Sequence, residues 1–295
     1  MRKSLQLQAD MTRELGACVF DVTLDCEDGA PVGAEAEHAS LVADLLGTVQ
    51  DGCRVGVRVH AVEHAAFFSD VQILFAQAGR LPAFVMLPKV DSLTSVQSAV
   101  NAIDAAGGAA VPVHVLLESP LAVHHAFDIA AHPRVQSLSF GLMDFVSAHG
   151  GAVPSSAMGV EGQFSHPLVV RAKAELASAA HAHGKVPSHC VVTEFRDHSA
   201  LREAALKARN LLGYTRMWSI HPDQIRTIVD VFAPTVDEVD QAVHIIERAA
   251  AQDWGPIQVA GQLHDRASYR FYWQVLERAH QTGRPLPGEV RHYFS

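Results

Sequence analysis

The stretch from Val111 to Asp144, VPVHVLLESPLAVHHAFDIAAHPRVQSLSFGLMD, decides the fold. Its two apolar runs, Val111–Leu117 and Val135–Phe140, have the length and the valine and leucine content of buried strands. Between them, Leu121–Ala131 has the length of a helix, and Pro120 suits its first turn because the N–H that proline lacks is not needed there. Strand, helix and strand in this order predict a βαβ unit, which builds a parallel sheet.

The same unit recurs on both sides of this stretch. Five further apolar runs predict strands: Cys18–Leu24, Arg54–His60, Ala83–Leu87, Val186–Val192 and Arg216–Ile220. Alanine-rich stretches after them predict helices: Ala34–Val49, Glu63–Ala78, Ser92–Ala106, Pro167–His183, Ser199–Leu212, Pro222–Val231 and Val236–Ala251. Seven strands that alternate with helices of this length favour an α/β fold of the (β/α)₈ TIM-barrel type.

An eighth strand is the open point of this barrel. The alternating segment Ser4–Gln8 could supply it; otherwise the first strand is missing or is built in another way. A doubly wound sheet is the alternative fold. A sheet of that kind is expected to carry a glycine-rich phosphate loop, and neither GxGxxG nor GxxxxGKS occurs in the sequence. We therefore expect the barrel.

The last part of the chain breaks the alternation of strands and helices. Glycines and prolines interrupt residues 252–295 around one predicted helix, Ala267–Gln281, whose first turns carry four aromatic side chains between Tyr269 and Trp273. An aromatic cluster of this size is costly to leave exposed on a lone monomer. We predict that residues 1–251 form the catalytic barrel and that the rest is a C-terminal helical arm, which packs on a neighbouring subunit.

Composition argues against several classes of function. A formal net charge of −9 gives no support to nucleic-acid binding. No apolar run reaches the roughly 18 residues of a membrane span, and no signal peptide is visible at the N-terminus, so we expect a cytoplasmic protein. The four cysteines form no CxxC pair and the 18 histidines show no zinc-binding spacing, which argues against a zinc site.

Charged residues gather where the predicted strands end. In a barrel of this type the chemistry lies at the carboxyl ends of the strands and in the loops that follow. The charged or titratable residues at these positions are Asp25, Glu27, Asp28, Arg58, Lys89, Glu118, Asp144, Glu194 and His221. Ordinary strand ends carry glycine, asparagine, serine or threonine, so this excess of carboxylates indicates a functional site.

Glu118 and Asp144 are the candidate metal ligands. They end neighbouring predicted strands, 26 residues apart (144 minus 118), so both carboxylates should face the same mouth of the barrel. Two hard oxygen ligands with room for water and substrate suit Mg²⁺ or Mn²⁺ better than Zn²⁺. The alternative is that Glu118 caps its helix and Asp144 satisfies a turn.

Arg58 is the candidate substrate anchor, since its fork of donors matches a carboxylate or an enolate. An ion pair with the acidic cluster at Asp25, Glu27 and Asp28 is the alternative, and the two roles are compatible. Three carboxylates this close should raise one another's pKa unless a cation or Arg58 lies near them.

Seven short motifs in the same order resemble those of one family, the citrate lyase β-subunit-like group of the HpcH/HpaI aldolase superfamily, which includes malyl-CoA and citramalyl-CoA lyases. The motifs are LDCEDG at 24–29, VRVH at 57–60, LPKV at 87–90, LLESP at 116–120, FGLMD at 140–144, SIHPDQI at 219–225 and GQLHD at 261–265. Each motif is weak alone, but seven of them in family order are specific.

This resemblance implies a Mg²⁺ (or Mn²⁺) site formed by Glu118 and Asp144, with Arg58 gripping the carboxylate end of the substrate. It implies that Asp265, delivered from a neighbouring subunit in a homotrimer or a dimer of trimers, acts as acid and base. Arg13 stands where the family has a lysine, which makes it a candidate contact of coenzyme A. Roles in binding the substrate or in supporting these residues are expected for Asp25, Glu27, Asp28, Lys89 and His221.

The function that follows is Mg²⁺-dependent cleavage of a carbon–carbon bond in a 3-hydroxyacyl-CoA, such as malyl-CoA or citramalyl-CoA, by retro-aldol or Claisen-type chemistry. Two alternatives stay open. One is an aldolase that acts on free 2-oxo acids without coenzyme A. The other is a non-catalytic binding subunit, which would bind metal poorly and lack a proton carrier.

Overall fold

The computed structural model describes residues 1–29, 31–194 and 196–294. Within these residues, one sheet holds seven parallel strands, each paired with the next along the chain. The strands are β1 (Val22–Asp25), β2 (Val55–Arg58), β3 (Val85–Leu87), β4 (Val113–Leu117), β5 (Val135–Phe140), β6 (Val186–His189) and β7 (Arg216–Met217). This order confirms the predicted α/β fold and excludes a doubly wound sheet, in which the strand order reverses.

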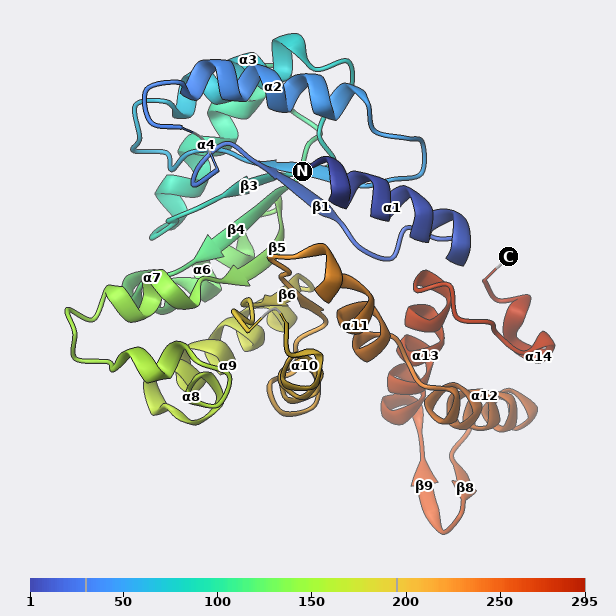
Figure 1. Cartoon of the computed structure of the whole chain (residues 1–295). Helices are drawn as coiled ribbons and strands as arrows, with labels where there is room; N and C mark the ends of the chain where they lie inside the picture. The colour runs from blue at the N-terminus through green and yellow to red at the C-terminus, as the bar shows by residue number, and fades with distance from the viewer. Residues whose placement is uncertain (30, 195, 295) are drawn as a thin grey trace.

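The sheet curls into a partial barrel with helices around its outer side, a variant of the TIM-type architecture (Figure 1). The helices between the strands and after β7 are α2 (Glu35–Gly47), α3 (Phe67–Gln77), α4 (Leu93–Ala105), α5 (Pro120–His124), α6 (Ala126–Ala131), α7 (Leu142–Ser147), η1 (Ser155–Met158), α8 (Gly162–Ser165), α9 (Pro167–Ala182), α10 (His198–Leu212) and α11 (Pro222–Phe232). The strands read as apolar runs because both of their faces are covered; β4 is buried at every position. None of the described helices is long and apolar enough to cross a membrane.

The segment Ser4–Gln8 is not a strand, so this candidate for the eighth strand was wrong. It lies in helix α1 (Arg2–Leu15), whose buried residues share one helix face. The side-chain amide of Gln8 donates to the main-chain carbonyl oxygens of Phe20 and Arg54, at 2.7 and 2.8 Å. These hydrogen bonds explain why a polar residue is buried here, and they tie α1 to the start of β1.

The edges of β1 and β7 are not paired with each other in the described part of the chain, so the barrel is open along this side. Two ion pairs join its flanks. Asp21 Oδ2 lies 2.6 Å from Arg216 Nη2, and Glu14 Oε2 of α1 lies 2.6 Å from Arg226 Nη2 of α11. A cavity of about 200 Å³ lies inside the partial barrel and is lined by residues of β1, β3 to β7 and α11. Contacts between side chains therefore take the place of strand pairing at this seam.

The C-terminal segment forms a second hydrophobic core together with α12 (Val236–Ala251). It contains α13 (Arg266–Gln281), which matches the predicted helix, a short α14 (Gly288–Arg291), and a hairpin of β8 (Ile257–Val259) and β9 (Gln262–His264) that we did not predict. Figure 1 shows α12 to α14 at the right, with the hairpin projecting away from the large sheet. The division of the chain at residue 251 and the docking of this segment on a neighbouring subunit stay predictions.

Candidate functional site

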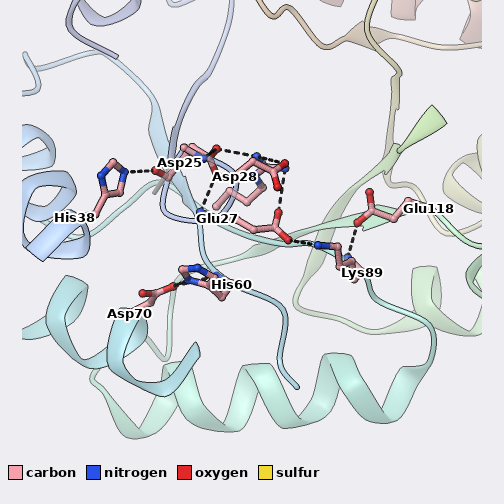
Figure 2. A network of polar contacts seen from close by, with 10 residues as sticks. Asp25, Glu27, Asp28, His38, His60, Asp70, Lys89 and Glu118 are labelled. Carbon is pink, nitrogen blue, oxygen red and sulfur yellow. Dashed lines mark hydrogen bonds and ion pairs between the residues drawn. The ribbon is translucent and has the colours of Figure 1, made fainter. Parts of the chain in front are cut away.

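The carboxyl ends of β1 to β4 bring together six of the charged side chains singled out in the sequence (Figure 2). Parallel strands place their carboxyl ends at the same edge of a sheet, so residues far apart in the sequence meet here. We call these six side chains the mouth cluster: Asp25, Glu27, Asp28, Arg58, Lys89 and Glu118.

Arg58 makes ion pairs with all three acids that end or follow β1. Its Nε and Nη2 atoms donate to the two oxygens of Asp25, both at 2.7 Å. Nη2 also lies 3.1 Å from Asp28 Oδ2, and Nη1 lies 3.1 Å from Glu27 Oε2. The ion pair considered for Arg58 is therefore present, and the fork-on-fork contact with Asp25 holds the guanidinium in one orientation.

Asp25 is held in its charged form by these contacts. Burial acts to raise the pKa of Asp25, but hydrogen bonds from Arg58 and from the main-chain N–H groups of Glu27 and Gly29 outweigh burial and lower it. His38 contacts the main-chain oxygen of Asp25 at 2.8 Å (Figure 2). Arg58 carries five N–H donors, and its four contacts with Asp25, Asp28 and Glu27 leave one N–H of Nη1 for an anionic substrate.

Glu118 directly follows β4, Asp144 lies in the first turn of α7 just after β5, and the two carboxylates interact electrostatically. Glu118 is buried and accepts a hydrogen bond from the main-chain N–H of Lys89 at 2.7 Å. Burial first, and then the negative charge of Asp144, raise the pKa of Glu118 from 4.5 to about 8. Glu118 does not cap the following helix, because the Ser119 side chain caps α5 by accepting from the N–H of Ala122 at 2.9 Å.

This pair has the chemistry of a site for a divalent cation, because two carboxylates that disfavour each other's charge are relieved when a cation lies between them. Around the mouth, five carboxylates face two basic side chains, an excess of three negative charges (five minus two) when all are ionised: Asp25, Glu27, Asp28, Glu118 and Asp144 against Arg58 and Lys89. No three His, Cys, Asp or Glu side chains of the described residues are placed to hold a metal ion by themselves. Two oxygen donors with water and substrate completing the shell fit Mg²⁺ or Mn²⁺.

Gly141 leaves the space that Glu118 occupies. A Cβ atom at this position would lie 2.5 Å from both Cβ and Oε2 of Glu118, closer than such atoms can approach. We expect Gly141→Ala to push the Glu118 carboxylate aside and to weaken Mn²⁺ binding about tenfold or more, as changes beside metal ligands do. Calorimetric titration with Mn²⁺ measures this, with Gly288→Ala as the matched control because an added Cβ there has nothing within 4 Å. Unchanged Mn²⁺ affinity in Gly141→Ala would contradict this position for the site.

Four other candidate residues lie outside the mouth cluster as defined above, and two of them, Glu194 and His221, follow β6 and β7 at the carboxyl ends of the same sheet. Asp265 caps α13 through two main-chain N–H groups, directly after the hairpin, which Figure 1 shows on the far side from the carboxyl ends of β3 to β5. Arg13 pairs with Asp10 in the last turn of α1. His221 caps α11 and lines the cavity inside the partial barrel. Glu194 is exposed in the loop after β6.

One supporting contact of the cluster escaped the sequence analysis. Asp70, on α3, accepts from the main-chain N–H of His60 at 3.0 Å and lies 2.6 Å from His60 Nδ1 (Figure 2). Both side chains are buried. The contact holds the chain two residues beyond Arg58 and so helps to fix the strand end that carries it. In the sequence, the one sign of this contact is a single aspartate, Asp70, within the mostly apolar helix sequence FFSDVQILF.

Comparison with known proteins gives one family and a consistent set of relatives. Residues 5–222 match the sequence model of the family described as HpcH/HpaI aldolase/citrate lyase. An L-malyl-CoA/β-methylmalyl-CoA lyase of Cereibacter sphaeroides is 31% identical over 277 residues, which cover 88% of this chain and 86% of that protein.

Solved structures extend this likeness to the fold. The crystal structure of a citrate lyase from Burkholderia xenovorans LB400 is 50% identical with a TM-score of 0.86, covering 99% of this chain and 92% of that one. The structure of CitE from Mycobacterium tuberculosis in complex with magnesium and pyruvate is 25% identical with a TM-score of 0.61, covering 79% and 88% of the two chains.

Proposed function

Because the chain belongs to the HpcH/HpaI aldolase/citrate lyase family, we propose that it is a Mg²⁺-dependent carbon–carbon lyase that cleaves a 3-hydroxyacyl-CoA such as malyl-CoA or citramalyl-CoA. The observation that carries the proposal is the buried Glu118 beside Asp144, at the same end of the sheet as Arg58. Metal ligands and an anion-binding group at one mouth are what the cleavage of an anionic hydroxyacyl thioester requires.

The roles of the residues follow from their positions. Glu118 and Asp144 would hold Mg²⁺. When bound, this ion would polarise the substrate's hydroxyl oxygen, which becomes the new carbonyl oxygen, and would stabilise the negative charge that develops there. Arg58 binds the substrate's carboxylate through Nη1, while Asp25 keeps the guanidinium in place. Lys89 and Glu27 lie beside this anchor.

Cleavage moves two protons and one pair of bonding electrons. The hydroxyl proton leaves as the new carbonyl forms, the carbon–carbon bond breaks, and its electrons pass to the enolate of the acyl thioester. That enolate carbon then takes up a proton. The three acids of the mouth cluster beside the anchor, Asp25, Glu27 and Asp28, are committed to ion pairs with Arg58 or Lys89. A separate carboxylate is therefore needed for the enolate carbon, and we propose Asp265 of a neighbouring subunit.

We predict that activity returns when two inactive variants share one oligomer. Asp265→Asn and Glu118→Gln are each expected to be inactive alone. After dissociation and reassembly of equal amounts, about a quarter of the sites of a cyclic oligomer would combine an intact Glu118 with an intact Asp265 from the next subunit. Assay of the mixed oligomers, separated by differently charged tags, measures the recovery.

The control is each variant dissociated and reassembled by itself, which should stay inactive. Properly mixed oligomers without activity would show that Asp265 does not act across a subunit interface. It would then be only the cap of α13 seen in the single chain.

A screen of CoA thioesters and of free 2-oxo acids tests the function itself. We expect Mg²⁺-dependent release of acetyl-CoA or propionyl-CoA from 3-hydroxyacyl-CoA substrates, detected by chromatography, and its loss with EDTA. Cleavage of free 2-oxo acids alone would favour the CoA-independent aldolase. One observation favours that second candidate: Arg13, the candidate coenzyme A contact, is paired with Asp10 away from the mouth cluster.

A further inference from the structure

Lys89 contacts two carboxylates of the mouth cluster, one through its main chain and one through its side chain. Its main-chain N–H donates to Glu118 Oε1 at 2.7 Å, and its side-chain Nζ lies 2.8 Å from Glu27 Oε1. The other oxygen of Glu27, Oε2, lies 3.1 Å from Arg58 Nη1. Figure 2 shows Lys89 between Glu27 and Glu118. One residue thus connects the carboxylate proposed for the metal with the guanidinium proposed for the substrate.

The main chain of Lys89 has a conformation that its contact with Glu118 explains. Its φ is 52°, in the left-handed region that side chains other than glycine rarely adopt. Such conformations persist where the surrounding structure holds them, and they gather at functional sites. Here the conformation turns the N–H toward Glu118 Oε1 directly after β3. Oε2 is the oxygen that faces Gly141, at the end of β5 and three residues before Asp144.

The side chain of Lys89 acts on the charge around Arg58. The Lys89 side chain is 52% exposed, whereas that of Glu27 is 8% exposed. A half-exposed ion pair adds little to stability, so stability does not account for the contact. Without this ammonium, the buried carboxylate of Glu27 would direct its whole charge at Arg58 Nη1, the atom that a substrate's carboxylate needs.

We propose that Lys89 is a positioning residue whose N–H orients Glu118 for the cation and whose ammonium holds Glu27, so that Arg58 Nη1 stays available to the substrate. The inference rests on the proposed function, in which Glu118 binds metal and Arg58 binds substrate. Lys89 itself touches neither of them.

Titration with Mn²⁺ alone tests the first half of the proposal, in which the main-chain N–H of Lys89 orients Glu118. Lys89→Gly keeps the N–H and the left-handed conformation, whereas Lys89→Val disfavours that conformation because valine is β-branched. We expect a Mn²⁺ Kd within about twofold of wild type for Lys89→Gly and about fivefold or more higher for Lys89→Val. Lys89→Ala, whose conflict with this conformation is milder, should fall between them and serves if the valine variant does not fold. Equal Mn²⁺ affinity in the glycine variant and in the folded alanine or valine variant would overturn this half.

Titration with pyruvate at saturating Mn²⁺ tests the second half of the proposal, in which the ammonium of Lys89 holds Glu27. Pyruvate is used because it offers the carboxylate that Arg58 would bind. We expect Lys89→Met to raise the pyruvate Kd about five- to tenfold with little change in Mn²⁺ affinity, because it removes one positive charge beside the anchor. Lys89→Arg should recover most of the affinity. Lys207→Met is the matched control, because it breaks a lysine–glutamate pair on α10, outside the mouth cluster. A pyruvate Kd for Lys89→Met within twofold of wild type would overturn this half.

A double variant shows whether Lys89 acts through Glu27. In a Glu27→Gln background the charge that Lys89 counters is gone, so we expect Lys89→Met to have no further effect on pyruvate binding. The same loss in both backgrounds would mean that Lys89 contacts the substrate directly, and would overturn the proposal.

These outcomes are distinguishable from failure of the proposed function. If the wild-type protein binds Mn²⁺ and pyruvate as expected but cleaves no CoA thioester, the proposed reaction is wrong and the inference about Lys89 stands. If the Mn²⁺-loaded protein does not bind pyruvate, the role of Arg58, and with it this inference, is wrong. Cleavage of CoA thioesters is then judged by its own assay.

Discussion

Replacing Glu118 by glutamine is expected to abolish Mg²⁺-dependent cleavage while leaving the fold intact. Glutamine has the same shape, and its Oε1 can still accept the hydrogen bond from the N–H of Lys89. Only the negative charge and one metal-binding oxygen are lost. We expect kcat/KM to fall by well over about a hundredfold, since losing a residue that merely supports a metal ligand already costs about 10- to 100-fold.

The same variant should be more stable than wild type when EDTA removes metal. The pKa of Glu118 is about 8 in the folded protein against 4.5 for an ordinary glutamate, so its ionisation opposes folding. Wild-type stability is therefore expected to decline as the pH rises from about 4.5 to about 8, by an amount on the order of 1–3 kcal/mol, and Glu118→Gln should remove this decline. Scanning calorimetry across this pH range measures both effects. Unchanged activity would remove Glu118 from the site, and Glu247→Gln, exposed on α12, is the matched control.

Arg58→Lys is expected to lower kcat/KM about a hundredfold, although it keeps the positive charge. A lysine ammonium cannot reproduce the two parallel contacts with Asp25 and still present a donor to the substrate's carboxylate. Because Arg58 would bind the carboxylate in the ground state and would also stabilise the negative charge that develops in the transition state, KM should rise and kcat should fall. Steady-state kinetics with the CoA thioester, together with calorimetric binding of pyruvate, measures both changes.

The matched control for this variant is Arg209→Lys. Arg209 also binds both oxygens of one carboxylate, Glu238 on α12, at 2.6 and 2.7 Å, but it does so away from the mouth cluster. It should therefore cost stability without changing KM. Near-wild-type kinetics for Arg58→Lys, or the same kinetic loss for Arg209→Lys, would argue against Arg58 as the anchor.

The parallel sheet could be predicted from the sequence because its signals are local. Val135–Phe140 is buried at nearly every position, so it reads as a continuous apolar run, and its predicted and observed limits agree. Once the strands are known to be parallel, their carboxyl ends must meet at one mouth. The neighbourhood of Arg58, Lys89 and Glu118 follows from that geometry, and the family resemblance is confirmed by the match over residues 5–222.

Other features depend on contacts that local patterns do not contain. Ser4–Gln8 alternates like a strand, but it lies in helix α1, where the side chain of Gln8 is buried and donates to main-chain carbonyl oxygens. The β8–β9 hairpin turns at Ala260 and Gly261, with φ of 49° and 81°. Glycine is typical of such a turn, whereas alanine at its first central position conceals it. The position of Asp265 relative to an active site depends on subunit contacts, which one chain does not contain.

The open seam between β1 and β7 has a consequence for how the chain is made on the ribosome. Each strand pairs with the one before it, so the sheet can grow by one strand and helix at a time as the chain emerges. The contacts Asp21–Arg216 and Glu14–Arg226 join residues 195 and 212 positions apart, so they must wait until nearly the whole sheet has left the exit tunnel. By then the folded strands already hold these ends near each other, which lowers the entropy cost of joining them. The ion pairs across the seam therefore form last, and a nascent chain that is arrested before this point would lack them.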